Sequence, residues 1–338
     1  MKAWEVHAKE GLDALTLVER PEPDLQDGYV LLKVKAVSVN YRDLLVVKGA
    51  YSSYQSPFIP FSDGVGEVVA VGAGVTRVKV GDRVAGIFMQ AWIEGPFSLE
   101  KSKSALGGSS VDGMLAEYVA LPETGVVHIP DHLTDEEAAT LPCAAVTAWN
   151  ALTTDGKLKA GDTLLILGSG GVSLFALQFA KLMGIRVIAL SGNDAKVERL
   201  MQMGALESVN YNAIADWGEK ISALTNGVGV DRVIEVGGAN TLNQSVRAVR
   251  YGGHISLIGV LTGFKSEIST VSILHKGICV QGIYVGSREM FEAMNRAIHH
   301  TRMRPVVDRI FSFEEPKAAL EHMERKAHFG KIVIHVNS

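Results

Sequence analysis

Cysteine is scarce in this sequence, and long apolar runs are missing. Only Cys143 and Cys279 occur among 338 residues, which is too few for a disulfide framework or a four-cysteine zinc site. No apolar run approaches the ~18 residues of a membrane span, and the N-terminal stretch lacks the apolar core of a signal peptide. We therefore expect a protein of the reducing cytoplasm without a membrane partner.

Excess positive charge is also missing. The formal net charge is −4, so the composition offers no broad basic surface, and we expect no nucleic-acid partner. Hydrophobic residues make up 47% and charged residues 21% of the chain, which is typical of a globular protein with a large core. The length is enough for two domains of ordinary size, and we expect the partner to be a small-molecule substrate.

The rest of the sequence is interpreted around the stretch 164–184. The apolar run Leu164–Leu167 predicts a buried strand, a glycine turn follows, and helical apolar spacing then runs to Gly184. This order is typical of a dinucleotide-binding βα unit, in which the turn approaches a pyrophosphate and the helix N-terminus offers N–H groups. Glycine turns also occur where nothing binds, and Ser173 stands where the fingerprint has Gly or Ala. We assign cofactor binding to Gly168, Ser169, Gly170, Gly171 and Val172.

Two kinds of pattern divide the chain. Residues 1–125 have mostly strand and turn patterns, whereas strands and helices alternate from Thr163, which predicts a doubly wound parallel sheet of α/β class. A capping box at Thr134–Glu137 opens a helix before that sheet. We place the second domain at 126–299. The tail 300–338 is too small to fold alone and should pack back on the first domain, with a binding cleft between the domains.

Several ordered motifs cover nearly the whole chain. They are Asn40–Asp43, Asp63–Glu67, Gly81–Val84, Leu141–Cys143 through Trp149, the glycine turn, and Phe329–Val333. In this order they resemble the medium-chain dehydrogenase/reductase superfamily, most closely its zinc-free branch of quinone oxidoreductases and zinc-type alcohol dehydrogenase-like proteins. The resemblance implies a GroES-like catalytic domain at 1–125, completed by the tail, and a Rossmann domain at 126–299.

The resemblance also bears on zinc. Zinc-dependent members hold the catalytic ion with a Cys, a His and a second Cys, and the matching places here are Asn40, Ser62 and Cys143. One thiolate cannot hold a catalytic zinc, which needs about three protein ligands. The lobe that carries four cysteines in those relatives corresponds to residues 92–113, which contain none. We expect no metal. Cys143 is then a small packed residue, with a reactive thiol as the alternative.

Cofactor choice depends on the end of the second strand of the βα unit. NAD-binding folds usually place an acid there, but this chain has Ser191 and Asn193, which tolerate a 2′-phosphate. In similar proteins a Lys and a Tyr at places matching Lys196 and Tyr211 bind that phosphate. We expect NADP(H), with NAD(H) as the alternative. Asp194 and Lys196 also fit a helix N-cap and a solvated helix face.

Three further segments are assigned to the cofactor. In the family, backbone at Val236 and at Gly259, Val260 and Leu261 lines the nicotinamide, and both segments also fit tight βα turns. Lys331 matches a basic residue that reaches the pyrophosphate in relatives. Its alternative is an exposed strand lysine.

The resemblance implies a zinc-independent NADP(H) oxidoreductase that acts on a quinone, an enone or enal, or a carbonyl. A metal-free NAD(P)-dependent alcohol dehydrogenase and a nucleotide-binding protein without turnover are the alternatives. Charge that builds on the substrate oxygen needs a donor, for which the candidates are Tyr51, Asn40 and Ser62. Tyr51 and Tyr54 could also simply pack a loop. The apolar Gly277–Ile283 predicts an edge strand, and we expect a homodimer or a tetramer of dimers.

Overall fold

The computed structural model describes residues 1–7, 11–50, 57–108, 110–154 and 158–336. The chain forms two compact units, Met1–Val146 with Gly286–Ser338, and Thr147–Val285. These boundaries differ from the predicted 125/126 and 299/300, because the flanking segments pack with the first unit. Strand β7 (Val126–His128) pairs with β5 (Arg83–Gly86), and Asn295 of helix α10 (Arg288–Thr301) donates to the carbonyl of His128.

The first unit is built on a seven-stranded sheet. Its order is β14-β15-β3-β4-β5-β7, with β6 also paired to β3, and β1 and β2 form a separate antiparallel pair. The other strands and helices of this unit are β1 (Lys2–Val6), β2 (Leu15–Glu19), β3 (Tyr29–Val39), β4 (Asp63–Val71), β6 (Tyr118–Pro122), β14 (Val307–Ser312), β15 (Lys331–His335), α1 (Tyr41–Val47), α2 (Leu99–Ser102), α3 (Asp135–Ala138) and α11 (Pro316–Glu324).

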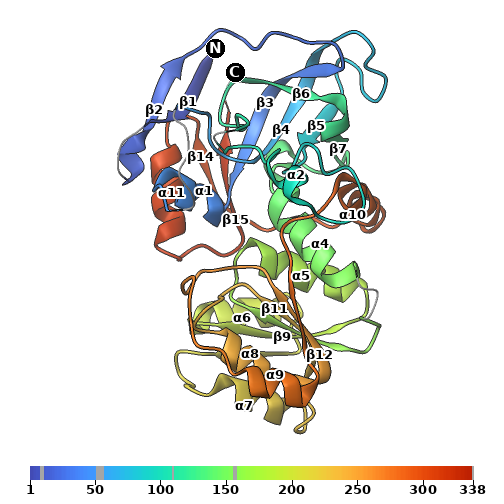
Figure 1. The fold of residues 1–338 in the computed structure, drawn as a ribbon, viewed down its shortest axis with the longest axis vertical. Coiled ribbons are helices and arrows are strands. Elements are labelled where there is room, and N and C mark those ends of the chain that lie inside the picture. The colour runs from blue at the N-terminus through green and yellow to red at the C-terminus, as the bar shows by residue number, and fades with distance from the viewer. Residues whose placement is uncertain (8–10, 51–56, 109, 155–157, 337–338) are drawn as a thin grey trace. The chain divides into compact units, whose positions relative to one another are not determined.

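The C-terminal tail completes this sheet. Strand β15 pairs antiparallel with β3, with Ile332 opposite Val39, and parallel with β14. Figure 1 shows these red strands beside the blue β3. The prediction that the tail packs back on the first domain is therefore confirmed.

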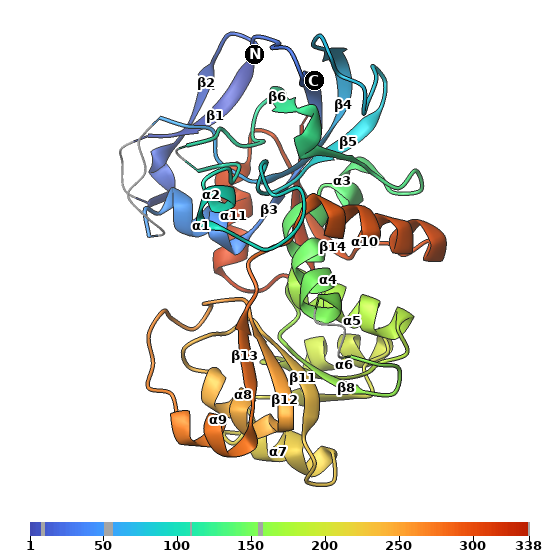
Figure 2. The same cartoon turned by 45° about the vertical axis from the view of Figure 1, so that its right-hand side comes forward.

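The second unit contains a six-stranded parallel sheet in the order β10-β9-β8-β11-β12-β13. In chain order this is 3-2-1-4-5-6, the Rossmann arrangement, and it confirms the predicted doubly wound sheet. Figure 2 shows β11, β12 and β13 lying side by side. The elements are β8 (Thr163–Leu167), β9 (Arg186–Ser191), β10 (Glu207–Asn210), β11 (Val230–Glu235), β12 (Val249–Leu257), β13 (Cys279–Gly282), α4 (Val146–Thr153), α5 (Gly171–Leu182), α6 (Asp194–Gln202), α7 (Trp217–Leu224), α8 (Leu242–Ala248) and α9 (Thr270–Lys276).

Two local expectations need correction. Helix α9 was not expected, and it ends at Gly277, whose φ of +60° is the left-handed C-cap conformation, so the edge strand shortens to Cys279–Gly282. The helix that the capping box opens, α3, already ends at Ala138, and a π-helical turn at Leu141–Ala145 then continues directly into α4. Within the part of the chain that the structure describes, no helix has the length and apolarity needed to cross a membrane.

Candidate functional site

The glycine turn of the second unit has the form of a phosphate cradle. Strand β8 is buried throughout, and Gly168 follows it at φ +76°, a left-handed conformation that favours glycine. Gly170 precedes α5 in extended backbone, and a Cβ placed there would meet no atom within 4 Å. The turn therefore leaves open space in front of the free N–H groups of the first helical turn. This arrangement fits a pyrophosphate.

Ser173 explains the imperfect fingerprint. Its side chain is buried, and its hydroxyl donates to the carbonyl of Leu167 at 2.6 Å. The third fingerprint position normally holds Gly or Ala because α5 must pack close to the strand. A serine fits here because it is small and its one polar group is satisfied by the strand end itself.

The residues predicted to choose between NADP and NAD come together. Ser191 ends β9, and its carbonyl accepts from the Tyr211 N–H at 3.0 Å. A Cβ on Gly192 would lie 2.7 Å from the Tyr211 hydroxyl oxygen, so the phenol lies directly over that turn. Asn193, rather than Asp194, caps α6, since its side chain accepts from the Lys196 N–H. An amide and a hydroxyl thus stand where an NAD-binding fold places an acid.

The turns after β11 and β12 are held by Glu235, which the sequence analysis missed. This carboxylate is completely buried and accepts from the Gly237 N–H at 2.8 Å, the Gly238 N–H at 3.0 Å and the Thr241 hydroxyl at 2.7 Å. A Cβ on Gly259 would lie 2.0 Å from the Val236 carbonyl oxygen, so the two turns touch through backbone. The available signal was an acid at the end of a predicted strand, directly before Val236 and a glycine pair.

In the first unit, a polar chain links four buried side chains. The Lys331 ammonium donates to the carbonyl of Val39 at 2.8 Å and to the Asn40 side-chain oxygen. The Asn40 amide lies 3.4 Å from the Ser62 hydroxyl, which lies 2.7 Å from the Asp63 carboxylate. We call Lys331, Asn40, Ser62 and Asp63 the polar chain.

Sheet register brings these four residues together. Asp63 at the start of β4 is opposite Ser38, and Ile332 near the start of β15 is opposite Val39, so both strands meet the end of β3 just before Asn40. Lys331 is only 4% exposed, which makes the alternative of an exposed strand lysine wrong. Its ammonium has two acceptors within its own unit, and a contact with a pyrophosphate would require it to leave them.

Backbone strain precedes Ser62. Phe61 is fully buried and adopts φ +69°, which is uncommon for a bulky residue. A Cβ on Gly107 would lie 2.7 Å from the Phe61 nitrogen, and one on Gly113 would lie 2.2 Å from the Phe61 oxygen. The cysteine-free loop therefore presses two glycines against this strained residue. Strain of this kind persists where the surroundings over-determine a site.

The three places that match zinc ligands do converge, but their chemistry does not fit zinc. The Cys143 N–H donates to Asp63 at 3.0 Å, and burial of the Cys143 thiol raises its pKa well above the usual range, with Asp63 adding to the rise. Asn40 and Ser62 offer zinc only an amide and a hydroxyl, where zinc-dependent relatives have a thiolate and an imidazole. Among the described residues, no group of three His, Cys, Asp or Glu side chains could hold a metal.

Asp43 adds a second buried carboxylate beside the chain. Its Oδ2 accepts from the Asn40 N–H at 2.8 Å, which fixes the start of α1. Burial raises the pKa of Asp43 to about 6, opposed by the neighbouring Arg42 guanidinium and reinforced by Asp63. Burial also raises the pKa of Asp63, and Lys331 is the main group that lowers it.

The raised pKa of Asp43 predicts a pH-dependent stability. Because its folded-state pKa is about 6 and its unfolded value about 4, the folded state binds the proton more tightly. This contribution is full below pH ~4 and is lost as the pH rises through ~6, by up to ~3 kcal/mol. Asp43→Asn removes it, so the free energy of unfolding of the wild type should fall relative to the variant across that window. Urea denaturation at pH 4, 5, 6 and 7 gives the free energy of unfolding of both proteins. A difference between wild type and variant that does not change with pH would contradict this prediction.

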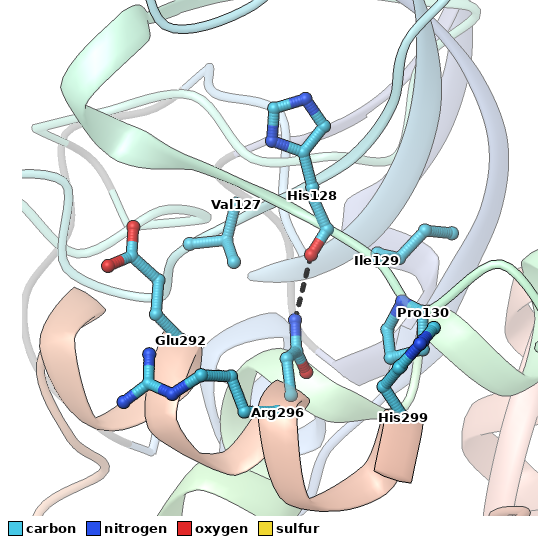
Figure 3. A pocket seen from close by; sticks show the side chains of 8 residues that line it. Val127, His128, Ile129, Pro130, Glu292, Arg296 and His299 are labelled. Atoms are coloured by element: carbon cyan, nitrogen blue, oxygen red, sulfur yellow. Dashed lines mark hydrogen bonds between the residues drawn. The ribbon is translucent and has the colours of Figure 1, made fainter. Parts of the chain in front are cut away.

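Two further locations need mention. Tyr51, the third predicted donor, lies outside the described residues, as does Tyr54. A hollow of about 510 Å³ lies between β7 and α10 (Figure 3), and no predicted site residue lines it. Its lining residues are Val127, His128, Ile129, Pro130, Glu292, Asn295, Arg296 and His299.

Known proteins match this chain along its length. The model for the alcohol dehydrogenase GroES-like domain matches residues 26–131, and the zinc-binding dehydrogenase model matches residues 171–300. A zinc-type alcohol dehydrogenase-like protein of Schizosaccharomyces pombe is 41% identical over 97% of this chain and 96% of its own. The chain belongs to the medium-chain dehydrogenase/reductase superfamily. As a member, it is an NAD(P)-dependent oxidoreductase.

Solved structures of this superfamily differ in cofactor. An NAD-dependent alcohol dehydrogenase matches with a TM-score of 0.91 and 30% identity, over all of both chains. A mycobacterial protein complexed with NADPH matches with a TM-score of 0.84 and 26% identity, over 99% of both chains. A nicotinamide cofactor is therefore common to the family, while the choice of NADP or NAD varies among its members.

Proposed function

We propose that this dehydrogenase/reductase is a zinc-independent, NADP(H)-dependent oxidoreductase whose substrate is a quinone, an enone or enal, or a carbonyl compound. The observation that carries the proposal is the polar chain. Its Asn40 amide and Ser62 hydroxyl stand at two of the three places that match catalytic zinc ligands, and Lys331 contacts Asn40. These groups bind no zinc, but they supply a buried cation and a hydrogen-bond donor where charge would develop on a substrate oxygen.

The roles of the other residues follow from their geometry. The bound nicotinamide would supply or accept the hydride. Gly168, Gly170 and the start of α5 would bind the pyrophosphate, while Ser191, Asn193, Lys196 and Tyr211 would bind the ribose phosphate. Glu235 would hold the backbone of Gly237 and Gly238 in place for the nicotinamide. Asn40 donates to the substrate oxygen, and Tyr51 remains a candidate proton donor.

Metal removal tests this function. We expect NADPH oxidation with at least one of a panel of quinones, enals and aldehydes, and an unchanged rate after dialysis against a chelator. We expect the rate to be unchanged because Asn40 and Ser62 cannot replace a Cys and a His as zinc ligands. Elemental analysis showing one zinc per chain, together with loss of activity on its removal, would overturn the proposal.

A metal-free alcohol dehydrogenase is the second candidate, and the similarity to an alcohol dehydrogenase-like relative favours it. The same panel distinguishes the two candidates. Faster turnover of alcohols with NAD(P)⁺ than of quinones or enals with NADPH would support the alcohol dehydrogenase.

We also propose a homodimer. Strand β13 is the edge of the second unit's sheet, and Val271 and Leu274 of the preceding α9 are strongly exposed apolar residues. An exposed edge of this kind invites pairing with a second copy. Sedimentation equilibrium at micromolar concentration should give twice the chain mass of 36.3 kDa. A single species at the monomer mass would count against the dimer.

A further inference from the structure

The direction of every hydrogen bond in the polar chain is fixed from its lysine end. An ammonium has only donors, so the Asn40 atom that it contacts must be the side-chain oxygen. The Asn40 nitrogen then faces the Ser62 oxygen at 3.4 Å and donates to it. A flipped amide would place its N–H groups against the ammonium, which would leave both groups unsatisfied in a buried site.

The hydroxyl of Ser62 is committed by the same logic. Ser62 carries one proton, and its oxygen accepts from Asn40, so that proton goes to Asp63 Oδ1 at 2.7 Å. The other Asp63 oxygen accepts from the Cys143 N–H. Ser62 is 0% exposed, whereas Asn40 retains 7% exposure. Ser62 therefore has neither a spare proton nor surface for a substrate.

Asn40 differs from Ser62, because it has two side-chain N–H groups. Its nitrogen faces the Ser62 hydroxyl and interacts with the Asp63 carboxylate, and these two acceptors are themselves hydrogen-bonded at 2.7 Å. The charge of Lys331 on the amide oxygen polarises the group and strengthens its N–H groups as donors. A positive charge thus stands at one end of the chain and the Asp63 carboxyl at the other, with two neutral groups between them.

We infer that Lys331 is a positioning residue that locks the Asn40 amide with its nitrogen directed away from the ammonium, so that Asn40 is the donor to the substrate oxygen, while Ser62 is an internal link without substrate contact. The inference rests on the proposed function. It separates the two donor candidates, and it gives the C-terminal tail a part in the site, because Lys331 begins β15.

Kinetics on four variants test these roles. Asn40→Ala should slow hydride transfer ~100-fold, at the scale of a lost oxyanion donor, and Lys331→Met at least ~10-fold. Ser62→Ala should slow it less than ~5-fold, because Lys331 still holds Asn40. The double variant Asn40→Ala/Lys331→Met should be no slower than Asn40→Ala alone, since Lys331 acts through Asn40. The NADPH dissociation constant should be unchanged in all four variants.

Lys276→Met is the matched control. The Lys276 ammonium likewise donates to backbone carbonyls, those of Val246, Arg247 and Val249, but it belongs to the second unit. Its loss should leave hydride transfer unchanged. An additive double variant, weaker NADPH binding in Lys331→Met, or a Ser62→Ala defect larger than that of Asn40→Ala would each overturn the inference.

A measurement without turnover separates this inference from the proposed function. In cofactor-free protein labelled with ¹⁵N-asparagine, the Asn40 side-chain amide signal is assigned by its loss in Asn40→Ala. It should shift in Lys331→Met and stay in place in Lys276→Met, even if the wild type turns over no tested substrate. In the wild type, an added ketone should shift one of its two protons, which keeps the test valid if Lys331→Met does not fold. If neither Lys331→Met nor the added ketone shifts the Asn40 amide signal, Lys331 does not lock the amide.

Discussion

Replacing Ser191 with aspartate is expected to raise the NADPH dissociation constant at least ~100-fold, which corresponds to ~2.7 kcal/mol. The new carboxylate would stand at the end of β9, where the Tyr211 phenol already covers the adjacent Gly192. Two charges a few ångströms apart repel by ~1 to 4 kcal/mol in partly solvated surroundings, which is enough for this loss. NADH binding should hold or improve, because the aspartate can accept from a ribose 2′-hydroxyl.

Ser191→Asn is the matched control, since it adds similar bulk without charge. Isothermal titration of the wild type and both variants with each cofactor gives the six dissociation constants that the comparison needs. If the wild type already binds NADH more tightly than NADPH, the assignment of this strand end to NADP is wrong. If Ser191→Asn weakens NADPH binding as much as the aspartate, bulk rather than charge is responsible.

Local patterns predicted the parts of the fold that depend on neighbours in sequence. The run Leu164–Leu167, the glycine turn and the helix to Gly184 each carry their own signal, because strand burial, turn conformation and helical spacing act over a few residues. The capping box at Thr134 is a similar case, and the structure shows both of its hydrogen bonds. The short π-helical turn after it has no comparable signature.

The polar chain could not be predicted in this way. Asn40 and Lys331 are 291 positions apart, and only the register of β15 on β3 brings them into contact. Nothing local distinguishes a buried strand lysine from an exposed one, so the alternatives for Lys331 both missed its contact with Asn40. Glu235 is a different case, because its partners Gly237, Gly238, Thr241 and Ser245 all follow it closely in the sequence, and an acid at the strand end was a local signal.

The predicted domain boundaries differ from those of the structure for a related reason. The predicted division followed the change of pattern, but helix α10 has the amphipathic character of any surface helix and can cover either sheet. Its Asn295 bonds the His128 carbonyl, and its Arg288 bonds the Thr124 carbonyl. These tertiary contacts assign it to the first unit.

Replacing Gly170 with alanine is expected to separate cofactor binding from folding. At Gly170 the φ of −78° suits alanine, and a Cβ would meet no atom within 4 Å. The free energy of unfolding should therefore stay the same or rise by up to ~1 kcal/mol, because alanine reduces the freedom of the unfolded chain. If the pyrophosphate lies against this turn, the methyl group occupies its place, and the NADPH dissociation constant should rise ~10- to 100-fold.

Gly282→Ala is the control for this variant, because its Cβ also meets open space and it lies on the edge strand β13 of the same sheet. It should leave NADPH binding within twofold of the wild type. Titration calorimetry and urea denaturation on both variants give the two quantities independently. Unchanged NADPH binding in Gly170→Ala would mean that the phosphates do not approach this turn. Equal losses in both variants would point to a general effect on the sheet rather than to the cradle, since only Gly170 borders the N-terminus of α5.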